Sequence, residues 1–127
     1  MAVNRVTRLN ELVKRALSLI LEREFTHADL GWVTISRVVV SKDLQHARVF
    51  FTVLGDENKE RHALERLQQA QGFIRAQLAH AVRLRYTPGL IFTLDQELKQ
   101  AMHVEAILDK LRNDTSAPPA AQSEPTS

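Results

Sequence analysis

The most constraining feature of this sequence is an interruption in a helical pattern at Ala70-Gln71-Gly72. Apolar residues recur at helical spacing before this point and resume after it, but the phase changes. A glycine in a helix interior costs about 1 kcal/mol relative to alanine. The pattern therefore indicates either one straight helix with a tolerated glycine or a corner between two helices. We favour the corner, because it lets both halves pack on one small sheet.

The segment around and after this interruption is basic. Residues 70–89 contain Arg75, Arg83 and Arg85 and no acidic side chain, whereas the whole chain has 17 basic and 15 acidic side chains and a formal net charge of +2. The positive charge is thus concentrated locally. Such a concentration is typical of a surface that binds a phosphate-rich partner.

The remaining periodicity predicts an α+β domain, in which helices cover one face of a three-stranded sheet. The two runs of β-branched residues are separated by a short polar turn, which predicts an antiparallel hairpin. The expected elements, in chain order, are helix 4–24, a connection over 25–31, strand 32–40, strand 46–54, helix 57–70, a second helical half after Gly72, strand 90–94 and helix 96–112.

The alternation of side chains in the first strand is imperfect. Val33 and Ile35 are in one phase, and the later residues Val38 and Val40 are in the other. A bulge near Ser36-Arg37 would explain the change, and so would burial of both faces at one end of the strand. The sequence does not distinguish the two.

Length and composition are those of an ordinary globular protein with a single core. We expect one domain over residues 1–112. Beyond Asn113 the composition falls to Ser, Thr, Pro, Ala, Gln and Glu, so residues 113–127 are expected to be disordered. The N-terminus lacks the pattern of a signal peptide and no stretch has the length and apolarity of a membrane span, so a cytoplasmic protein is expected.

Catalysis finds little support in the sequence. There is no cysteine, which excludes disulfides, thiolate metal sites and cysteine nucleophiles. No glycine-flanked serine nucleophile or phosphate-binding glycine loop occurs, and Asp43 and Asp95 lie where turns or helix caps are expected. We therefore expect that the protein is not an enzyme and that it binds no metal and no cofactor. The histidines are scattered, with no pair at metal-ligand spacing: His27, His46, His62, His80 and His103.

Nucleic-acid binding has more support in the sequence than catalysis does. If the second helical half runs to about residue 86, Arg75 and Arg83 project within about 80° of each other. Ala76 and Ala79 are small enough to let a phosphate backbone approach this face. Arginine is suited to bidentate phosphate contact. A solvated polar face is the competing interpretation.

Further basic residues extend the prediction. Arg85 and Tyr86 are expected at the end of that helix, where Tyr86 either stacks on a base or joins the core with its hydroxyl at the surface. Arg5, Arg8 and Lys14 form a second predicted patch on the first helix. A solvated face is also a reading of this patch, because an acidic residue lies among the basic ones.

The order and spacing of several fragments over residues 4–112 resemble the ribosome-binding factor A family, a group of bacterial small-subunit assembly proteins. The fragments that carry the resemblance are Arg5-Val6, Arg8, Val33-Thr34-Ile35, Val38-Val39-Val40-Ser41-Lys42-Asp43-Leu44, Ala47, Val49, Ala70-Gln71-Gly72-Phe73-Ile74-Arg75, Leu84-Arg85-Tyr86-Thr87-Pro88, Leu90, Phe92 and Leu94-Asp95.

The resemblance implies a type II KH-like fold, with Ala70 and Gly72 at an interhelical kink where KH domains have their Gly-x-x-Gly loop. It also implies a non-enzymatic factor that binds the free 30S subunit and 16S rRNA, assists late maturation and 5′-end processing, and helps adaptation to cold. A ribosome-associated GTPase is a further partner that only the family implies. The chain departs from the family pattern at His27-Ala28-Asp29, which replaces Asp-Pro-Arg, and at Ile91, where a basic residue is common.

Two other functions stay open at this stage. A protein-interaction module on the same scaffold would have a mostly apolar, salt-tolerant interface and no direct RNA binding. An RNA-processing enzyme would have to turn over precursor rRNA. The sequence does not specify the oligomeric state, and a monomer is the default expectation.

Overall fold

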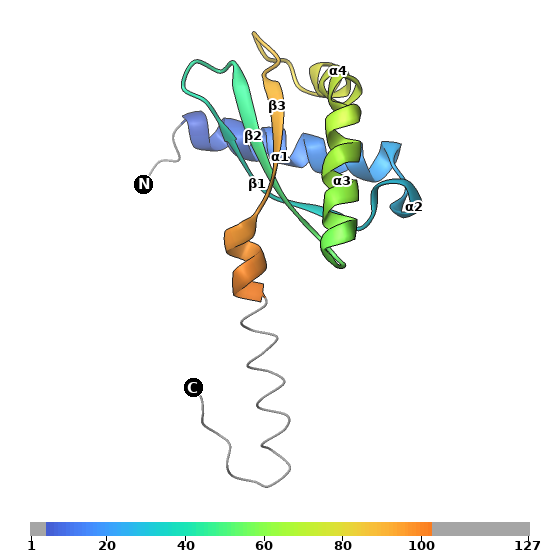
Figure 1. Cartoon of the computed structure of the whole chain (residues 1–127). Coiled ribbons are helices and arrows are strands. Elements are labelled where there is room, and N and C mark those ends of the chain that lie inside the picture. Colours follow the sequence, from blue (N-terminus) through green and yellow to red (C-terminus); the bar gives the residue numbers. More distant parts are fainter. Residues whose placement is uncertain (1–4, 103–127) are drawn as a thin grey trace, which may run out of the picture. The chain divides into compact units, whose positions relative to one another are not determined.

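A computed structural model describes residues 5–102 of the chain. Residues up to Asp95 belong to one compact unit, and a second unit begins at Gln96, whose described residues 96–102 are helical. The predicted limit of the domain at residue 112 and the predicted disordered tail lie outside the described residues. The elements of the first unit are α1 (Arg5–Glu24), α2 (His27–Leu30), β1 (Val33–Val40), β2 (His46–Val53), α3 (Glu57–Gln69), α4 (Gln71–Ala81) and β3 (Gly89–Leu94) (Figure 1).

The three strands form one mixed sheet in the order β1-β2-β3. Strands β1 and β2 pair antiparallel, as the two runs of β-branched residues predict. Strand β3 pairs parallel with β2, so the chain must cross from one end of the sheet to the other between them. Helices α3 and α4 make this crossover (Figure 1).

A bulge in β1 explains its irregular alternation. Ile35 pairs with Phe51 and Arg37 with Phe50, so the register shifts at Ser36. The Ser36 hydroxyl donates to Oδ2 of Asp95 at 2.6 Å. The bulge thus anchors the carboxylate at the end of β3, and the alternative of a strand buried on both faces at one end is wrong.

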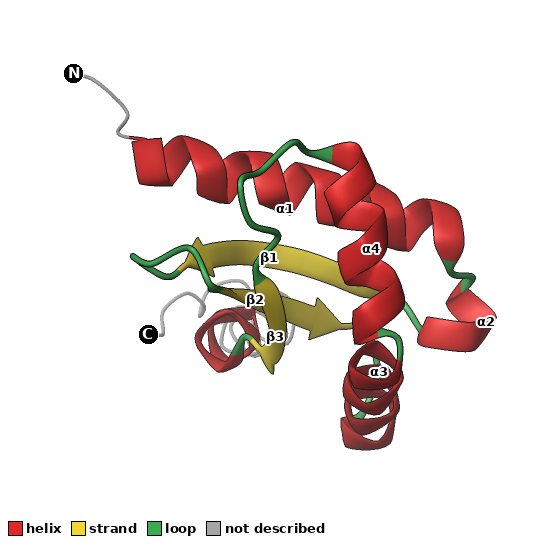
Figure 2. Cartoon of the chain, turned by 90° about the horizontal axis from the view of Figure 1, so that it is seen from above, coloured by secondary structure: helices red, strands yellow, loops and turns green. Residues whose placement is uncertain are grey.

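The core lies between one face of the sheet and the helices. Figure 2 shows α1 and α4 on this face, and α3 adds Ala63 and Leu67 to the same core. Alternate strand residues point away from it, and Val39 and Ile91 are exposed. The prediction of helices covering one face is confirmed. The sheet side chains in the core are Ile35, Val38, Val40, Ala47, Val49, Phe51, Leu90 and Phe92.

The interrupted helix is a corner between two helices, as predicted. Helix α3 ends at Gln69 and α4 begins at Gln71, with Ala70 between them at φ −91° and ψ 6°. Ala70 is buried between the two helices' core residues Leu67 and Ile74. Gly72 has no positive φ, and a β-carbon added there would meet no atom within 4 Å. The corner therefore depends on the small buried Ala70 more than on the conformational freedom of glycine.

Two details differ from the sequence-based expectation. Residues 25–31 are not a plain connection, because Thr26 accepts a hydrogen bond from the Asp29 backbone N–H at 3.0 Å and starts α2. This short helix ends at Gly31, whose φ of 95° favours glycine. Helix α4 ends at Ala81, and Val82 is extended with φ −131° and ψ 127°.

The corner leads to a stability prediction. Ala70→Leu overfills a buried position and is expected to lower the free energy of unfolding by about 1–3 kcal/mol. Gly72→Ala introduces a better helix former into open space and is expected to raise it by as much as about 1 kcal/mol. Urea unfolding followed by circular dichroism measures both. Equal destabilisation by the two variants would contradict the role given to Ala70.

Candidate nucleic-acid interface

Arg75 braces the segment that follows α4. Its Nε and Nη2 donate to the carbonyl oxygen of Thr87 at 3.1 and 2.6 Å. Two of the five guanidinium donors are thereby used, and the exposed side chain keeps the others for a ligand. Arg75 thus contributes a positive charge and also restrains the backbone of residues 82–88 through its hydrogen bonds to Thr87.

Arg83 and Arg85 lie on that irregular segment, and the predicted helical stripe from Arg75 to Tyr86 is wrong. The helix stops at Ala81 because Val82 turns into the core, where it is buried. Arg83, Arg85 and Tyr86 are nevertheless exposed. The basic residues after Gly72 are therefore held near α4 by the Arg75–Thr87 contact and not by helical spacing.

The same segment packs against the first half of α1. Leu84, Tyr86 and Pro88 line a small cavity of about 30 Å³ together with Leu9 and Val13. Arg85 also lines this cavity, so this charged side chain adjoins the helix that carries the second predicted patch. The fold brings together two sets of residues that are far apart in the sequence.

The residues of the second predicted patch do not all lie on one face of α1. Arg5 precedes Leu9 by one turn and lies on the same stripe, and Arg8 is beside it at about 60°. Lys14 comes nine positions after Arg5, which places it about 180° around the helix. Lys14 is half-buried and lies one helical turn after Asn10. The Oδ1 atom of Asn10 accepts a hydrogen bond from the Val40 N–H at 2.9 Å. Lys14 therefore does not share a face with Arg5 and Arg8.

The predicted basic residues have no ion-pair partner in the part of the chain that the structure describes. Among residues 5–102, the arginines that form ion pairs include Arg23 with Glu24, Arg37 with Asp95 and Arg66 with Asp29. None of the predicted binding residues has an acidic partner in that part of the chain. Their charges are thus available to an external anion: Arg5, Arg8, Lys14, Arg75, Arg83 and Arg85.

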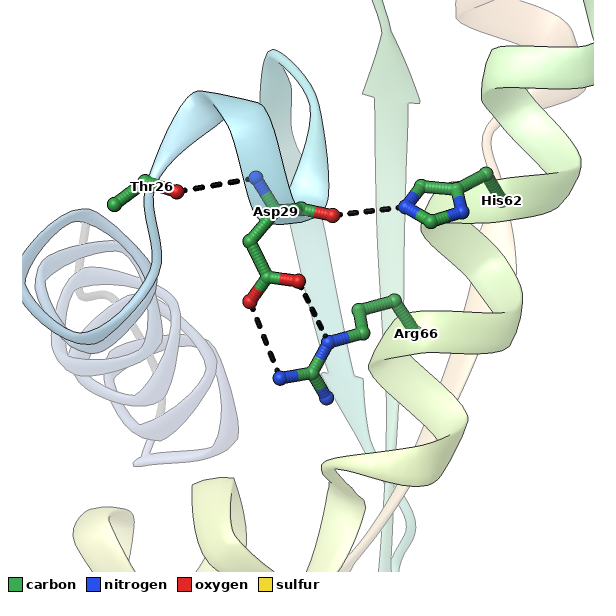
Figure 3. A network of polar contacts seen from close by, with 4 residues as sticks. All are labelled: Thr26, Asp29, His62 and Arg66. Carbon is green, nitrogen blue, oxygen red and sulfur yellow. Dashed lines mark hydrogen bonds and ion pairs between the residues drawn. The ribbon is translucent and has the colours of Figure 1, made fainter.

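Asp29 joins α2 to α3 through a polar network that sequence reasoning missed. Its carboxylate accepts from Nε and Nη2 of Arg66 at 2.9 and 3.1 Å, and its carbonyl oxygen accepts from Nε2 of His62 at 2.8 Å (Figure 3). The hydrogen bond from Arg66 lowers the pKa of the Asp29 carboxyl below its ordinary value of 3.8. No spacing rule links residues 29 and 66, which meet only in the folded chain.

The first segment that departs from the family pattern, His27-Ala28-Asp29, has a defined conformation in the structure. His27-Ala28-Asp29 forms α2, capped by Thr26 and tied to α3 by the network in Figure 3. The other departure, Ile91, lies exposed on the open sheet face and pairs in register with Arg48. Arg48 is thus the exposed cation next to the position at which a basic residue is common.

Other kinds of site receive no support from the described residues. Among residues 5–102, no three His, Cys, Asp or Glu side chains are grouped as metal ligands. Over the same range, no helix has both the length and the apolarity needed to cross a membrane.

Comparison with known proteins gives the family. The family model described as ribosome-binding factor A matches residues 5–108. The chain belongs to the ribosome-binding factor A family. Curated members include those of Clostridium acetobutylicum, 39% identical over 88% of this chain and 93% of the relative, and Heliobacterium modesticaldum, 37% identical over 93% and 99%.

Solved structures agree with this membership and with a KH-like fold. The crystal structure of ribosome-binding factor A from Thermus thermophilus is 30% identical, with a TM-score of 0.60 over 72% of this chain and 97% of that one. A homology model of the Thermus thermophilus factor, as fitted into a cryo-EM map of its complex with the 30S subunit, gives 30% identity and a TM-score of 0.59, over 68% of this chain and 90% of that one. The expected family and fold are therefore confirmed.

The Asp29–Arg66 pair predicts a pH dependence of stability. Because the pKa of Asp29 is lowered in the folded protein, its contribution is present above the ordinary pKa and is lost as the pH falls through the folded-state pKa. Asp29→Asn is expected to lower the urea midpoint at pH 7, by an amount that shrinks towards pH 3. Glu65→Gln, at an exposed position on the same helix as Arg66, is the control. A midpoint difference that stays constant across this pH range would contradict the prediction.

Proposed function

We propose that this protein binds the free 30S subunit through 16S rRNA, using exposed arginines of α1, α4 and the 82–88 segment. The observation that carries the proposal is the packing of the 82–88 segment against Leu9 and Val13 of α1, together with the hydrogen bonds from Arg75 of α4 to Thr87 of this segment. Exposed arginines without an ion-pair partner among residues 5–102 lie on all three elements. The 30S complex of the Thermus thermophilus factor supports the choice of partner. The five arginines of this surface, called here the arginine surface, are Arg5, Arg8, Arg75, Arg83 and Arg85.

The chemistry of this surface suits a phosphate backbone. Guanidinium groups bind phosphate oxygens with two parallel hydrogen bonds, and the donors of Arg75 that do not bond Thr87 can do so. Gly72 supports close approach, because it is exposed and carries no side chain at the start of α4. Lys14 then acts as a separate phosphate contact on another side of α1.

The biological role follows from the family. We propose a non-catalytic assembly factor of the cytoplasm that assists late maturation and 5′-end processing of 16S rRNA and growth in the cold. It would act as a monomer, as one KH-like domain over residues 1–112 with a disordered tail beyond it. A ribosome-associated GTPase would assist its release.

Charge removal tests the RNA contact. Each phosphate contact contributes about 0.7–0.9 to the slope of log affinity against log salt, so Arg83→Gln with Arg85→Gln is expected to reduce that slope by about 1.5. Both side chains are exposed, which leaves the fold intact. Co-sedimentation with free 30S subunits across a salt series measures the slope.

The control for this experiment is Arg61→Gln, at an exposed position of α3. It removes one charge outside the arginine surface and is expected to leave the slope nearly unchanged. Binding by the double variant with the wild-type salt slope would overturn the arginine assignment. Binding that is insensitive to salt in every variant would favour the alternative of a protein-interaction module without direct RNA contact.

A charge-conserving change tests the bracing role of Arg75. Arg75→Lys keeps the positive charge but cannot donate to the Thr87 oxygen with two guanidinium nitrogens. We expect a 30S affinity reduced about 3- to 10-fold, corresponding to the loss of a hydrogen bond, with an unchanged salt slope. Arg83→Lys is the matched variant, because Arg83 braces nothing in the described residues. An equal loss in both variants would contradict the bracing role.

A further inference from the structure

A second concave surface lies at the other end of α1. A cavity of about 640 Å³ opens between the last turns of α1, helix α2 and the start of β1. Its apolar lining includes Leu21, Phe25 and Ile35. Arg5 and Glu22 are 17 positions apart on α1, so this cavity lies about 25 Å along the helix axis from the start of the arginine surface. The two surfaces can therefore be occupied at the same time.

One wall of the cavity is an aromatic pair. The rings of His27 and Trp32 are stacked, with centroids 3.4 Å apart and planes at 12°. Trp32 is nevertheless 58% exposed, a high value for the largest apolar side chain. The pair is fixed in place, because His27 belongs to α2, which is capped by Thr26 and tied to α3 through Asp29. The structure thus presents an ordered indole at the rim of a cavity.

The lining of this cavity carries one carboxylate, and the Arg66 guanidinium, 5.4 Å from the centroid of the Phe25 ring, is paired with Asp29. Glu22 is the only Asp, Glu, Lys or Arg in its lining. Within residues 5–102 Glu22 has no ion-pair partner, whereas Glu24 nearby is paired with Arg23 at 3.1 Å. A carboxylate without a compensating cation repels phosphate and attracts a positively charged group. The cavity is therefore unsuited to RNA, in contrast to the arginine surface.

We propose that this cavity is a docking site for an arginine or lysine side chain from a basic segment of a protein partner. The cation would lie near the carboxylate of Glu22 and the face of the Trp32 indole that His27 does not cover. Its methylene stem would lie against the apolar residues of the cavity, as the stems of long basic side chains commonly do. The aromatic wall, the unpaired carboxylate and the apolar depth together match this one kind of side chain.

Intrinsic fluorescence reads out this site directly, because Trp32 is the only tryptophan of the chain. The full-length protein is titrated with a blocked oligoarginine peptide at low salt, and a saturable change in indole emission is expected. Glu22→Gln is expected to weaken peptide binding about 3- to 10-fold, within the range measured for ion pairs and cation–π contacts. The matched control is Glu11→Gln, which removes an exposed carboxylate from the other end of the same helix.

A second variant separates the aromatic contribution. Trp32→Leu keeps an apolar side chain at an exposed position, so folding is expected to be preserved. Binding of a fluorescently labelled peptide, followed by anisotropy, is expected to weaken at least about 3-fold in this variant. Equal peptide affinities of Glu22→Gln and Glu11→Gln would overturn the proposal. A saturable change in Trp32 emission on addition of a uridine oligonucleotide without peptide would also overturn it, by showing that the site accepts RNA.

Discussion

The parallel pairing of β3 with β2 is the constraint on which the rest of this structure depends. Parallel neighbours need a long crossover, and here α3 and α4 supply it within a small domain. The crossover stays compact because the chain turns at the buried Ala70, so that both helices place core residues over the same sheet face. The return to β3 then passes α1, which places the exposed arginines of residues 82–88 beside a helix that begins far earlier in the chain.

Side-chain hydrogen bonds hold two parts of the fold in place, the segment before β3 and helix α2. Arg75 holds the carbonyl of Thr87 and so restrains a segment that has no regular secondary structure of its own. At the other end of the domain, Asp29 and Arg66 fix α2, and α2 in turn presents His27 to Trp32. In both places one arginine restrains the chain near a surface available to a partner. Arg75 keeps guanidinium donors that do not bond Thr87, whereas Arg66 is paired with Asp29.

The two surfaces that result differ in charge. The arginine surface borders the first half of α1, and the cavity with Glu22 borders its last turns. The proposed binding to the 30S subunit, a particle of RNA and protein, would bring the domain into contact with both kinds of partner chemistry. A polarised helix with one end suited to phosphate and the other to basic side chains would orient the domain on such a particle, and neither surface requires catalysis.

The sequence by itself determined the order of the three strands and of the longer helices, the hairpin, the interhelical corner and the local concentration of arginines. Each of these rests on interactions between near neighbours, namely side-chain periodicity, turn residues and charge density. Only the tertiary structure decided that α4 stops at Ala81 and that Asp29 meets Arg66. Those outcomes depend on which distant residues compete for the same buried space and the same hydrogen-bond donors, a competition that spacing along one chain does not encode.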